Sequence, residues 1–321
     1  MRSTPESSET AAEREAPTDQ ERASVKAERA ARKALRATRE AFFLHAQPLT
    51  PYVAVRIGDE LFFLPTDDGG LSKGVFARMG RKDIAVLERA VTWLGENGVL
   101  QPAQPEFVDV GANVGTTTVV ALRRRGFATA VALEPLPGNY RALRLNVVAN
   151  ELESRVQAVQ VAVSDRDGEL RLDVARLNKG GNRVAVDGAA SSSKDRIVVR
   201  ALTLDTLVAR GVIRPEKTGL LWVDTPAHEG HVLTGATNLL ERGTPLVVAI
   251  RPVRGREEQA RPWDVPPEAR ASAIAALTAS YTDIVELRKK SKQGRRRHPI
   301  DALPILVDSF RHCQDLLFVR R

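Results

Sequence analysis

The sequence predicts an α/β fold in which a parallel β-sheet is covered by helices. From Phe107 onward, short apolar runs alternate with amphipathic ones: FVDVG, TTTVVALRRRG, AVALE and then NYRALRLNVVANEL. Strands buried on both faces are apolar throughout, and parallel neighbours must be joined by crossover helices, so this alternation is typical of a parallel sheet. With 321 residues, 43% of them hydrophobic, the chain is long enough to bury such a core.

The remaining elements follow the same pattern to the end of the chain. Strands are expected at 159–164, 169–174, 196–201, 220–224, 245–250, 283–287 and 315–319. Helices are expected near 203–210, 229–241, 267–279 and 302–310. The segment 177–194 is rich in glycine and serine, which predicts a loop.

A different composition precedes the sheet. The first 21 residues are rich in Ser, Thr, Glu and Pro and are expected to be disordered, whereas Ala, Arg, Lys and Glu favour a helix over 23–44. The runs VAVRI and LFFLP predict a β-hairpin, and 82–94 predicts an amphipathic helix. We therefore expect a charged arm over 1–46, a hairpin-and-helix cap over 47–100 and the main domain over 101–321.

The net charge of +8 gathers in two segments. Residues 22–39 hold seven Lys or Arg against one Glu, and 288–298 hold seven Lys or Arg and no acid. Neither has interleaved aromatic residues for base stacking, so we interpret both as solvated surface, with weak contact to nucleic acid or to an anionic substrate left open. The single cysteine, Cys313, excludes an internal disulfide, and no run approaches the roughly 20 apolar residues of a membrane helix. We expect a soluble, cytoplasmic protein.

The stretch FVDVGANVGTTTVV, 107–120, predicts a strand that turns sharply into a helix. In an open parallel sheet, ligands bind at the carboxyl ends of strands, where such a turn offers backbone N–H groups beside a helix N-terminus. Gly111 and Gly115 remove Cβ where a ligand approaches, and Asn113 tolerates a left-handed conformation. The third glycine of a dinucleotide fingerprint and the lysine of a phosphate loop are both missing from the sequence, which predicts a nucleoside-like ligand without a pyrophosphate.

Two acids accompany this turn. Asp109 lies two residues before Gly111, and Glu134 ends the next strand, where a carboxylate can accept both hydrogens of a ribose diol. S-adenosylmethionine fits these features, because it carries a ribose, an ammonium and a sulfonium but no phosphate. The alternative is that both acids are structural, with Asp109 capping the turn and Glu134 merely ending a strand.

Six ordered segments resemble the FkbM family of S-adenosylmethionine-dependent methyltransferases. They are VDVGANVGTTT (108–118), ALEPLPGNYRALRLNVVAN (132–150), VAVSDRDGELRL (161–172), LTLDTL (202–207), LLWVDTPAHEGHVLTGA (220–236) and LLFV (316–319). The resemblance implies a class I methyltransferase fold: a Rossmann-like three-layer sandwich with a seven-stranded, mostly parallel sheet and an antiparallel strand near the C-terminus. The runs at 283–287 and 315–319 would supply a terminal hairpin.

The same resemblance implies cofactor contacts at the strand ends. By the family pattern the methionine end would be lined by Asp109, Gly111, Asn113 and Gly115. Glu134 would hold the ribose, and Ser164 and Asp165 would lie beside the adenine. Because Asp165 also opens the tight turn DRDG, its alternative role is turn geometry alone.

Four ionisable groups lie close together in DTPAHEGH (224–231), which begins at the end of the strand expected at 220–224. This strand is the fourth of the sheet that the resemblance implies. Asp224 ends that strand, and His228, Glu229 and His231 follow as a helix begins. Methyl transfer to an alcohol requires the acceptor proton to leave, so His228 is the candidate base, and Asp224 or Glu229 would orient it or accept the proton directly. Asp224 is also expected to contact the cofactor or the acceptor. The spacing matches no zinc motif, so no metal site is predicted.

The loop after Asp224 departs from the family pattern, which usually reads Asp, a small residue, Gln or Glu, Gly, any residue and then Glu. Asp224 and Glu229 match it, whereas Pro226 replaces the polar residue and Ala227 replaces the glycine. The departure leaves the shape of the loop open.

The resulting hypothesis is an S-adenosylmethionine-dependent O-methyltransferase that acts on a hydroxyl of a sugar or glycan, a lipid or a secondary metabolite. Two alternatives stay open. One is an RNA-binding or RNA-modifying methyltransferase that uses the basic segments. The other is a relative that binds the cofactor without transferring its methyl group.

Overall fold

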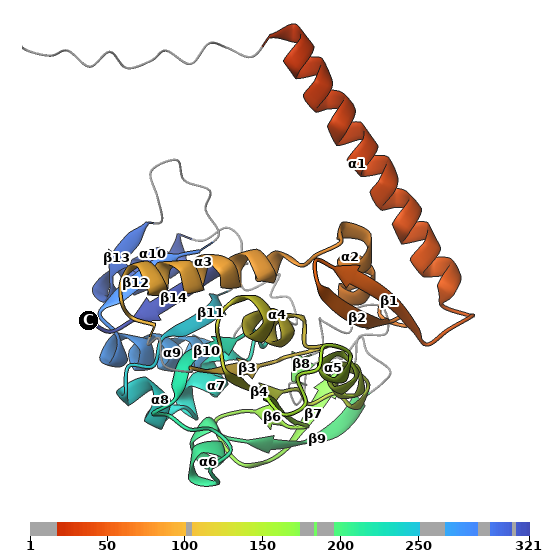
Figure 1. Ribbon diagram of the computed structural model, residues 1–321. Helices are drawn as coiled ribbons and strands as arrows, with labels where there is room; N and C mark the ends of the chain where they lie inside the picture. The colour runs from red at the N-terminus through yellow and green to blue at the C-terminus, as the bar shows by residue number, and fades with distance from the viewer. Residues whose placement is uncertain are drawn as a thin grey trace, which may run out of the picture.

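The computed structural model describes residues 18–100, 105–173, 183–184, 196–250, 267–287, 296–309 and 313–321. Its centre is an eight-stranded sheet with the strand order β13-β12-β14-β11-β10-β3-β4-β5 (Figure 1). The neighbours from β11 to β5 are parallel, and β14 is antiparallel to both β11 and β12. The strands are β3 (Glu106–Val110), β4 (Thr129–Leu133), β5 (Val156–Val159), β10 (Thr218–Val223), β11 (Leu246–Ile250), β12 (Asp283–Glu286), β13 (Arg297–Pro299) and β14 (Gln314–Val319). The predicted α/β fold, with an antiparallel strand near the C-terminus, is confirmed.

The sheet has one strand more than the seven expected. β13 pairs antiparallel with β12 and covers its outer edge. Side-chain contacts support this pairing, since Arg297 forms an ion pair with Asp283 at 2.7 Å and His298 Nε2 is hydrogen-bonded to Glu286 Oε1 at 2.9 Å. A three-residue polar strand gives no hydrophobic pattern, so the sequence assigns it only to the basic segment 288–298. The remainder of that segment, 288–295, lies outside the described residues.

The run at 159–164 is divided between two sheets, which corrects the single strand predicted there. β5 ends at Val159, and a two-residue strand, β6 (Ala162–Val163), then pairs parallel with β9 (Arg196–Leu202). In this second sheet, of order β6-β9-β7-β8, β9 pairs antiparallel with β7 (Gly168–Asp173), and β8 is Arg183–Val184. Most of the predicted loop 177–194 lies outside the described residues.

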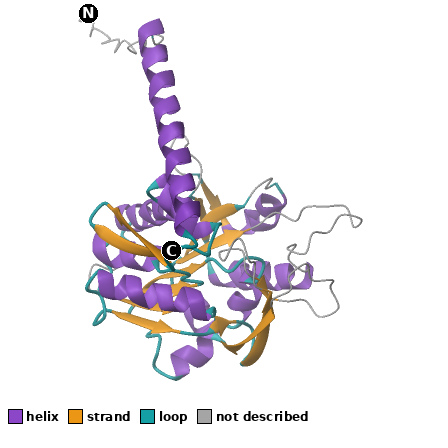
Figure 2. Ribbon diagram, turned by 90° about the vertical axis from the view of Figure 1, so that its right-hand side faces the viewer, coloured by secondary structure: helices purple, strands orange, loops and turns teal. Residues whose placement is uncertain are grey.

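Helices cover both faces of the main sheet (Figures 1 and 2). Successive side chains of a strand point to opposite faces, and the apolar core is accordingly divided in two. One part includes Phe107, Trp222 and Leu317 of the strands, with Leu87 and Val120 of helices α3 and α4. The other includes Val108, Leu221 and Phe318, with Val232 and Leu277 of α7 and α9. The helices of these layers are α3 (Lys82–Glu96), α4 (Thr116–Arg124), α5 (Pro137–Ala149), α6 (Leu204–Ala209), α7 (Glu229–Thr234), α8 (Thr237–Glu241), α9 (Pro267–Ser280) and α10 (Leu303–Asp308), which follows a short 3₁₀ turn, η3 (Ile300–Ala302).

The single helix predicted over 229–241 is two helices, α7 and α8, with Gly235 between them. Gly235 packs against the segment after β6, where an added Cβ would clash with the Ser164 carbonyl oxygen. The Asp205 carboxylate then accepts hydrogen bonds from the backbone N–H groups of Thr237 (3.0 Å) and of the next residue (2.8 Å), which starts α8 as a separate helix.

The cap consists of the expected hairpin, β1 (Tyr52–Ile57) and β2 (Glu60–Pro65), followed by α3. A further helix between them, α2 (Leu71–Arg78), is not indicated by the sequence pattern. The first helix, α1 (Asp19–Ala46), is longer than the predicted 23–44 and extends away from the body (Figure 1). No helix among the described residues is both long and apolar enough to cross a membrane.

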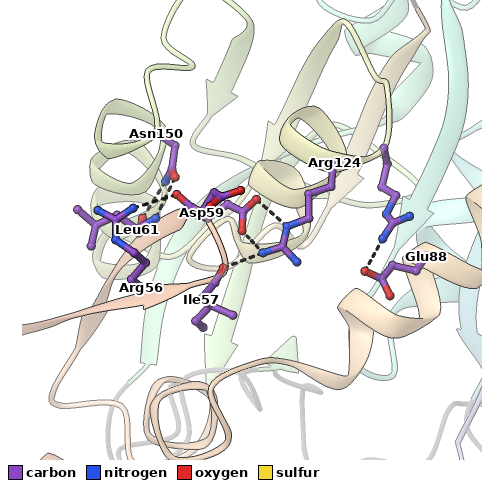
Figure 3. Close-up of polar contacts among 9 residues, drawn as sticks. Arg56, Ile57, Asp59, Leu61, Glu88, Arg124 and Asn150 are labelled. Atoms are coloured by element: carbon purple, nitrogen blue, oxygen red, sulfur yellow. Dashed lines mark hydrogen bonds and ion pairs between the residues drawn. The ribbon is translucent and has the colours of Figure 1, made fainter.

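Two asparagines, Asn146 of α5 and Asn150 at the C-cap of that helix, bind the free edge of β2. The side chain of Asn146 accepts a hydrogen bond from the Phe63 N–H at 2.6 Å and donates one to the Phe63 carbonyl at 3.2 Å. Asn150, one turn later, makes the same pair with Leu61 at 3.0 and 2.8 Å (Figure 3). Because Leu61 and Phe63 are two residues apart on one strand, the two side chains together take the place of a neighbouring strand.

A second polar contact fixes the hairpin turn to the main domain. Arg124 of α4 donates from Nε to the buried Glu60 at 2.7 Å and from Nη2 to the Ile57 carbonyl at 2.7 Å (Figure 3). In the same figure Glu88 of α3 pairs with Arg125. The apolar side chains of the hairpin belong to the same core as the strand residue Phe107. The cap and the sheet therefore share one core.

The asparagine contacts lead to a stability prediction. Asn146→Ala is expected to lower the free energy of unfolding by about 2–4 kcal/mol, because the partly buried N–H and carbonyl of Phe63 and the buried Val114 carbonyl lose their partner. Urea unfolding measures the change. Gln160→Ala, which removes an exposed amide side chain, is the control and should cost about 0.5 kcal/mol or less. Equal losses in the two variants would contradict the role given to Asn146.

Candidate functional site

A pocket opens at the carboxyl ends of β3, β4 and β10. Its walls include Gly111, Asn113, Glu134, Asp224, Thr225 and His228, together with apolar side chains such as Val161, Val163 and Leu172. This edge is where open α/β sheets bind ligands. The structure thus brings together five of the predicted site residues. The other five, Asp109, Gly115, Ser164, Asp165 and Glu229, are not among the described residues that line the pocket.

The glycine turn is fixed by main-chain contacts. The N–H groups of Gly111 and its neighbour both donate to the Leu133 carbonyl, at 2.9 and 3.0 Å. Gly111, Asn113 and Gly115 all have left-handed backbones, with φ of 85°, 54° and 82°. An added Cβ would lie 2.5 Å from the Asp224 carbonyl oxygen at Gly111 and 2.5 Å from Leu143 at Gly115. Close packing within the protein therefore disfavours a side chain at both glycines, and Gly111 also lies in the pocket wall.

Glu134 closes this turn from the end of β4. Its carboxylate accepts hydrogen bonds from the backbone N–H groups of Asn113 and Leu136, both at 2.9 Å, and from the Asn139 amide at 3.4 Å. Burial raises the pKa of Glu134 to about 7, although these hydrogen bonds act in the opposite direction. Within the described residues, Asn113 Oδ1 is buried in the same pocket wall without a hydrogen-bond partner. The turn thus offers two acceptors to a ligand.

Asp109 lies beneath the turn. It is 1% exposed, and its Oδ2 accepts the hydroxyl hydrogen of Thr118 at 2.6 Å, which links β3 to α4. Burial raises the pKa of Asp109 to about 7, against the effects of the Thr118 hydrogen bond and of the Arg81 charge. Asp109 therefore acts on the pocket through charge and through the position of the turn.

Arg81, at the start of α3 in the cap, contacts side chains at this edge of the sheet. No pattern in the sequence indicates that Arg81 belongs to the site. The guanidinium, 12% exposed, pairs with Asp83, meets Asp224 Oδ2 at 3.1 Å and donates to the Thr116 hydroxyl at 3.2 Å. Burial lowers its pKa, but the charges of Asp83, Asp224 and Asp109 outweigh that effect and leave the pKa above its ordinary value. Arg81 is therefore a permanent cation between the cap, α4 and the end of β10.

The loop after β10 begins with Asp224, whose N–H donates to the Val110 carbonyl at 3.1 Å while its carboxylate faces Arg81. Ala227 has a φ of 64°, the left-handed conformation that a glycine adopts freely. The replacement of the family glycine by Ala227 therefore keeps the left-handed backbone at a cost of about 1–2 kcal/mol.

A polar network joins this loop to the segment after β6. His228 Nε2 lies 3.0 Å from the Ser164 hydroxyl, which donates to Asp165 Oδ1 at 3.0 Å. Asp165 Oδ2 lies 3.2 Å from His231 Nδ1, and the two imidazole rings stack with centroids 4.6 Å apart. Partial burial raises the pKa of Asp165, but the hydrogen bonds from His231 and Ser164 outweigh it and hold the pKa below its usual value.

The network determines the state of His228. Since an ionised Asp165 can only accept, we assign the single Ser164 hydrogen to it and the His228 hydrogen to Nε2. The lone pair of His228 is then on Nδ1. Burial, helped by the nearby His231, lowers the pKa of His228 to about 4, so the ring is neutral at neutral pH.

Glu229 lies in the first turn of α7 and is buried there, away from the pocket lining that the structure describes. An acid at this position matches the positive end of a helix dipole. Within the described ranges, no group of three or more His, Cys, Asp or Glu side chains is arranged to hold a metal ion.

Comparison with known families decides the identity of the chain. The model of the methyltransferase FkbM domain matches residues 109–289, more than half of the sequence. The chain belongs to the FkbM methyltransferase family. The resemblance found in the sequence is confirmed, and the protein is an S-adenosylmethionine-dependent methyltransferase. The match begins at Asp109 and includes the pocket-lining residues after β3, β4 and β10.

Individual relatives of this FkbM methyltransferase are distant. The probable cobalt-precorrin-6B C(15)-methyltransferase (decarboxylating) of Halobacterium salinarum is 30% identical over 159 residues, which cover 48% of this chain and 82% of that protein. Among solved structures, M. jannaschii TYW2 in complex with AdoMet has a TM-score of 0.40 at 11% identity, covering 84% of this chain and 87% of that one. Methyltransferase FkbM from Methylobacillus flagellatus KT has a TM-score of 0.39 at 12% identity, covering 77% and 65%.

The backbone at Ala227 gives a stability prediction for this FkbM methyltransferase. Ala227→Gly is expected to raise the free energy of unfolding by about 0.5–1 kcal/mol, because the gain at positive φ exceeds the greater chain entropy of glycine. Urea unfolding again measures it. Ala275→Gly, at an exposed position within α9, is the matched control and should have the opposite sign, a loss of about 1 kcal/mol. A loss in both variants would show that Ala227 is not strained.

Proposed function

We propose that this FkbM methyltransferase transfers a methyl group to a hydroxyl of a sugar or glycan, a lipid or a secondary metabolite. The observation that carries the proposal is a neutral histidine, His228, in the pocket wall with its lone pair on Nδ1. S-adenosylmethionine, when bound, supplies an electrophilic methyl group on a sulfonium. The residues of the chain must hold that cofactor, orient the acceptor and receive its proton.

The pocket offers suitable groups for the cofactor. Glu134 is placed to accept the hydrogens of the ribose diol, and its three existing hydrogen bonds leave the carboxylate with acceptor capacity. The buried Asn113 Oδ1 is a second acceptor. Asp109 and Asp224 add negative charge near a cationic ligand. Ser164 and Asp165 remain the candidates for the adenine end, although Asp165 is already engaged by His231.

His228 is the proposed base. As the new carbon–oxygen bond forms, the acceptor oxygen gains positive charge and its proton becomes strongly acidic. A base with a pKa of about 4 is therefore sufficient late in the transfer. The imidazolium that results donates from Nε2 through Ser164 to the Asp165 carboxylate, which stabilises it. Asp224, already paired with Arg81, is proposed to orient the acceptor or the cofactor, and Glu229 to support the start of α7.

Transfer to carbon is the second candidate. It is favoured by the similarity to the probable C(15)-methyltransferase of Halobacterium salinarum, since the matched residues cover 82% of that protein at 30% identity. An electron-rich carbon attacks without prior loss of a proton, so such a reaction depends less on His228.

The proposal is tested with S-adenosylmethionine labelled with ¹³C in its methyl group. The acceptors are free and nucleotide-linked sugars, hydroxylated lipids, polyhydroxylated metabolites and RNA. Carbon NMR separates a methyl group on oxygen from one on carbon. An O-methyl product of a small acceptor supports the proposal, whereas a C-methyl product or a methylated RNA would replace it. Binding of the cofactor with no transfer to any acceptor would favour a relative without transferase activity.

The raised pKa of Glu134 predicts a pH dependence of cofactor binding. Only the carboxylate accepts both ribose hydrogens, so affinity should rise as pH increases through about 7. Between about pH 6 and 7.5 the dissociation constant should fall by about five- to tenfold, measured by calorimetry. Glu134→Gln should bind more weakly and lose most of this dependence, whereas Asp109→Asn should keep the part that Glu134 contributes. An affinity that is constant over this range in the unaltered protein would contradict the assignment.

The base assignment gives a kinetic prediction. His228→Ala is expected to lower kcat by about 100-fold or more while the dissociation constant of S-adenosylmethionine changes little, because the lost group acts on the acceptor proton. His231→Ala, which removes the stacked ring but leaves His228 and Ser164 in place, is the control and should have a much smaller effect. Undiminished turnover of His228→Ala with an identified acceptor would remove this residue from the mechanism.

A further inference from the structure

The helix α1 is the largest feature that the methyltransferase site does not use. It has 28 residues, and every residue from 18 to 38 is exposed. Only its C-terminal end is anchored, through the buried Phe43 and through Phe42, which stacks on Phe76 with ring centroids 5.6 Å apart. In both views the rest of α1 extends into solvent, away from the sheet (Figures 1 and 2).

One face of this exposed helix is a line of cations, which we call the α1 stripe: Arg22, Lys26, Arg29, Lys33 and Arg36. The positions recur every three or four residues, so they lie on one side of the helix, about one charge per turn over roughly 21 Å. All five are exposed. The chain thus presents a straight row of positive charge clear of its own surface.

The row is only partly neutralised by the protein. Arg22 lies 3.8 Å from Asp19 and Arg36 lies 2.8 Å from Glu40, one pair near each end. The three central cations, Lys26, Arg29 and Lys33, form no ion pair within the described residues. Like charges three and four residues apart on a helix repel each other. A partner with regularly spaced negative charge would relieve that repulsion.

We propose that the α1 stripe binds the phosphate backbone of a nucleic acid, without sequence preference. A nucleic acid strand is a linear array of phosphates, and Lys and Arg side chains that neutralise them release counterions, which drives association. The α1 stripe contains no aromatic side chain that could stack on bases. Its contacts are therefore confined to the phosphate backbone of the nucleic acid. The stripe lies outside the pocket, so it would hold the enzyme on this partner without taking part in methyl transfer.

The two faces of α1 beside the stripe argue against a lipid surface as the partner. One carries a line of alanines: Ala23, Ala27, Ala30, Ala34 and Ala37. Helices that lie in a membrane interface insert Trp, Phe or Leu side chains on the face beside their cations, and a methyl group buries too little surface for that purpose. The other face has exposed Val25 and Leu35, but it also carries Glu21 and Glu28, whose charge an anionic lipid surface repels. The α1 stripe is therefore suited to a polyanion in water.

The test uses the full-length protein and fluorescence anisotropy with labelled probes about 20 nucleotides long, a single-stranded RNA and a DNA duplex. Five phosphate contacts predict that the logarithm of the binding constant falls with the logarithm of salt concentration with a slope of about −3.5 for the single strand. The variant Lys26→Gln, Arg29→Gln, Lys33→Gln should reduce that slope by about 2 and weaken binding at low salt. Glutamine preserves helix propensity, and circular dichroism checks that α1 remains folded.

A matched control has the same change in net charge elsewhere: Arg123→Gln, Arg200→Gln, Arg242→Gln, all exposed and outside the pocket and α1. It should bind like the unaltered protein. Equal weakening in the two triple variants would mean that net charge alone attracts the probes, which overturns the proposal. So would stronger binding to vesicles containing phosphatidylserine than to either nucleic acid, since that result would assign the stripe to a lipid surface.

Discussion

The site depends on the contact between two strand ends, where a backbone carbonyl fills the space of a missing side chain. The Asp224 carbonyl oxygen would be 2.5 Å from a Cβ at Gly111, and the Asp224 N–H donates to the Val110 carbonyl. This contact holds the turn after β3 against the loop after β10. The same turn donates two backbone hydrogen bonds to the Leu133 carbonyl at the end of β4. Three walls of the pocket are therefore placed by main-chain geometry.

Charged side chains then determine the electrostatics of the pocket that the main chain has shaped. Arg81 pairs with Asp83 and Asp224, whereas Asp109 and Glu134 are held by hydrogen bonds, and burial raises the pKa values of both to about 7. A carboxyl group with such a pKa carries its proton part of the time near neutral pH, which limits the cost of burying negative charge. The cap supplies Arg81 and is itself held by Asn146 of α5 and Asn150 at the end of that helix, so it belongs to the scaffold of the site.

The sequence predicts those features whose cause is local or periodic. β3 and β10 lie within a residue or two of their predicted positions, because burial on both faces makes them apolar throughout. Gly111, Asn113 and Glu134 are found because carboxyl ends of parallel strands meet at one edge. Features caused by a distant segment are missed. Arg81 has its partner Asp224 143 positions away, and β13 is a three-residue strand whose pairing is with the edge of β12. Gly111 is placed in the pocket wall as predicted, but its close contact with the Asp224 carbonyl is not visible in the sequence.

In the proposed mechanism, the packing of His228 against His231 affects both the resting state of the base and its reaction. Burial and the neighbouring His231 keep the pKa of His228 at about 4, so the base is neutral when the acceptor arrives. The same stacking orients the ring, and the hydrogen bond to Ser164 fixes the tautomer. A weakly basic group is usually a poor proton acceptor. Here the reaction itself supplies the acidity, because the acceptor oxygen becomes cationic as it is methylated, and the low pKa then favours return of the proton to solvent before the next turnover.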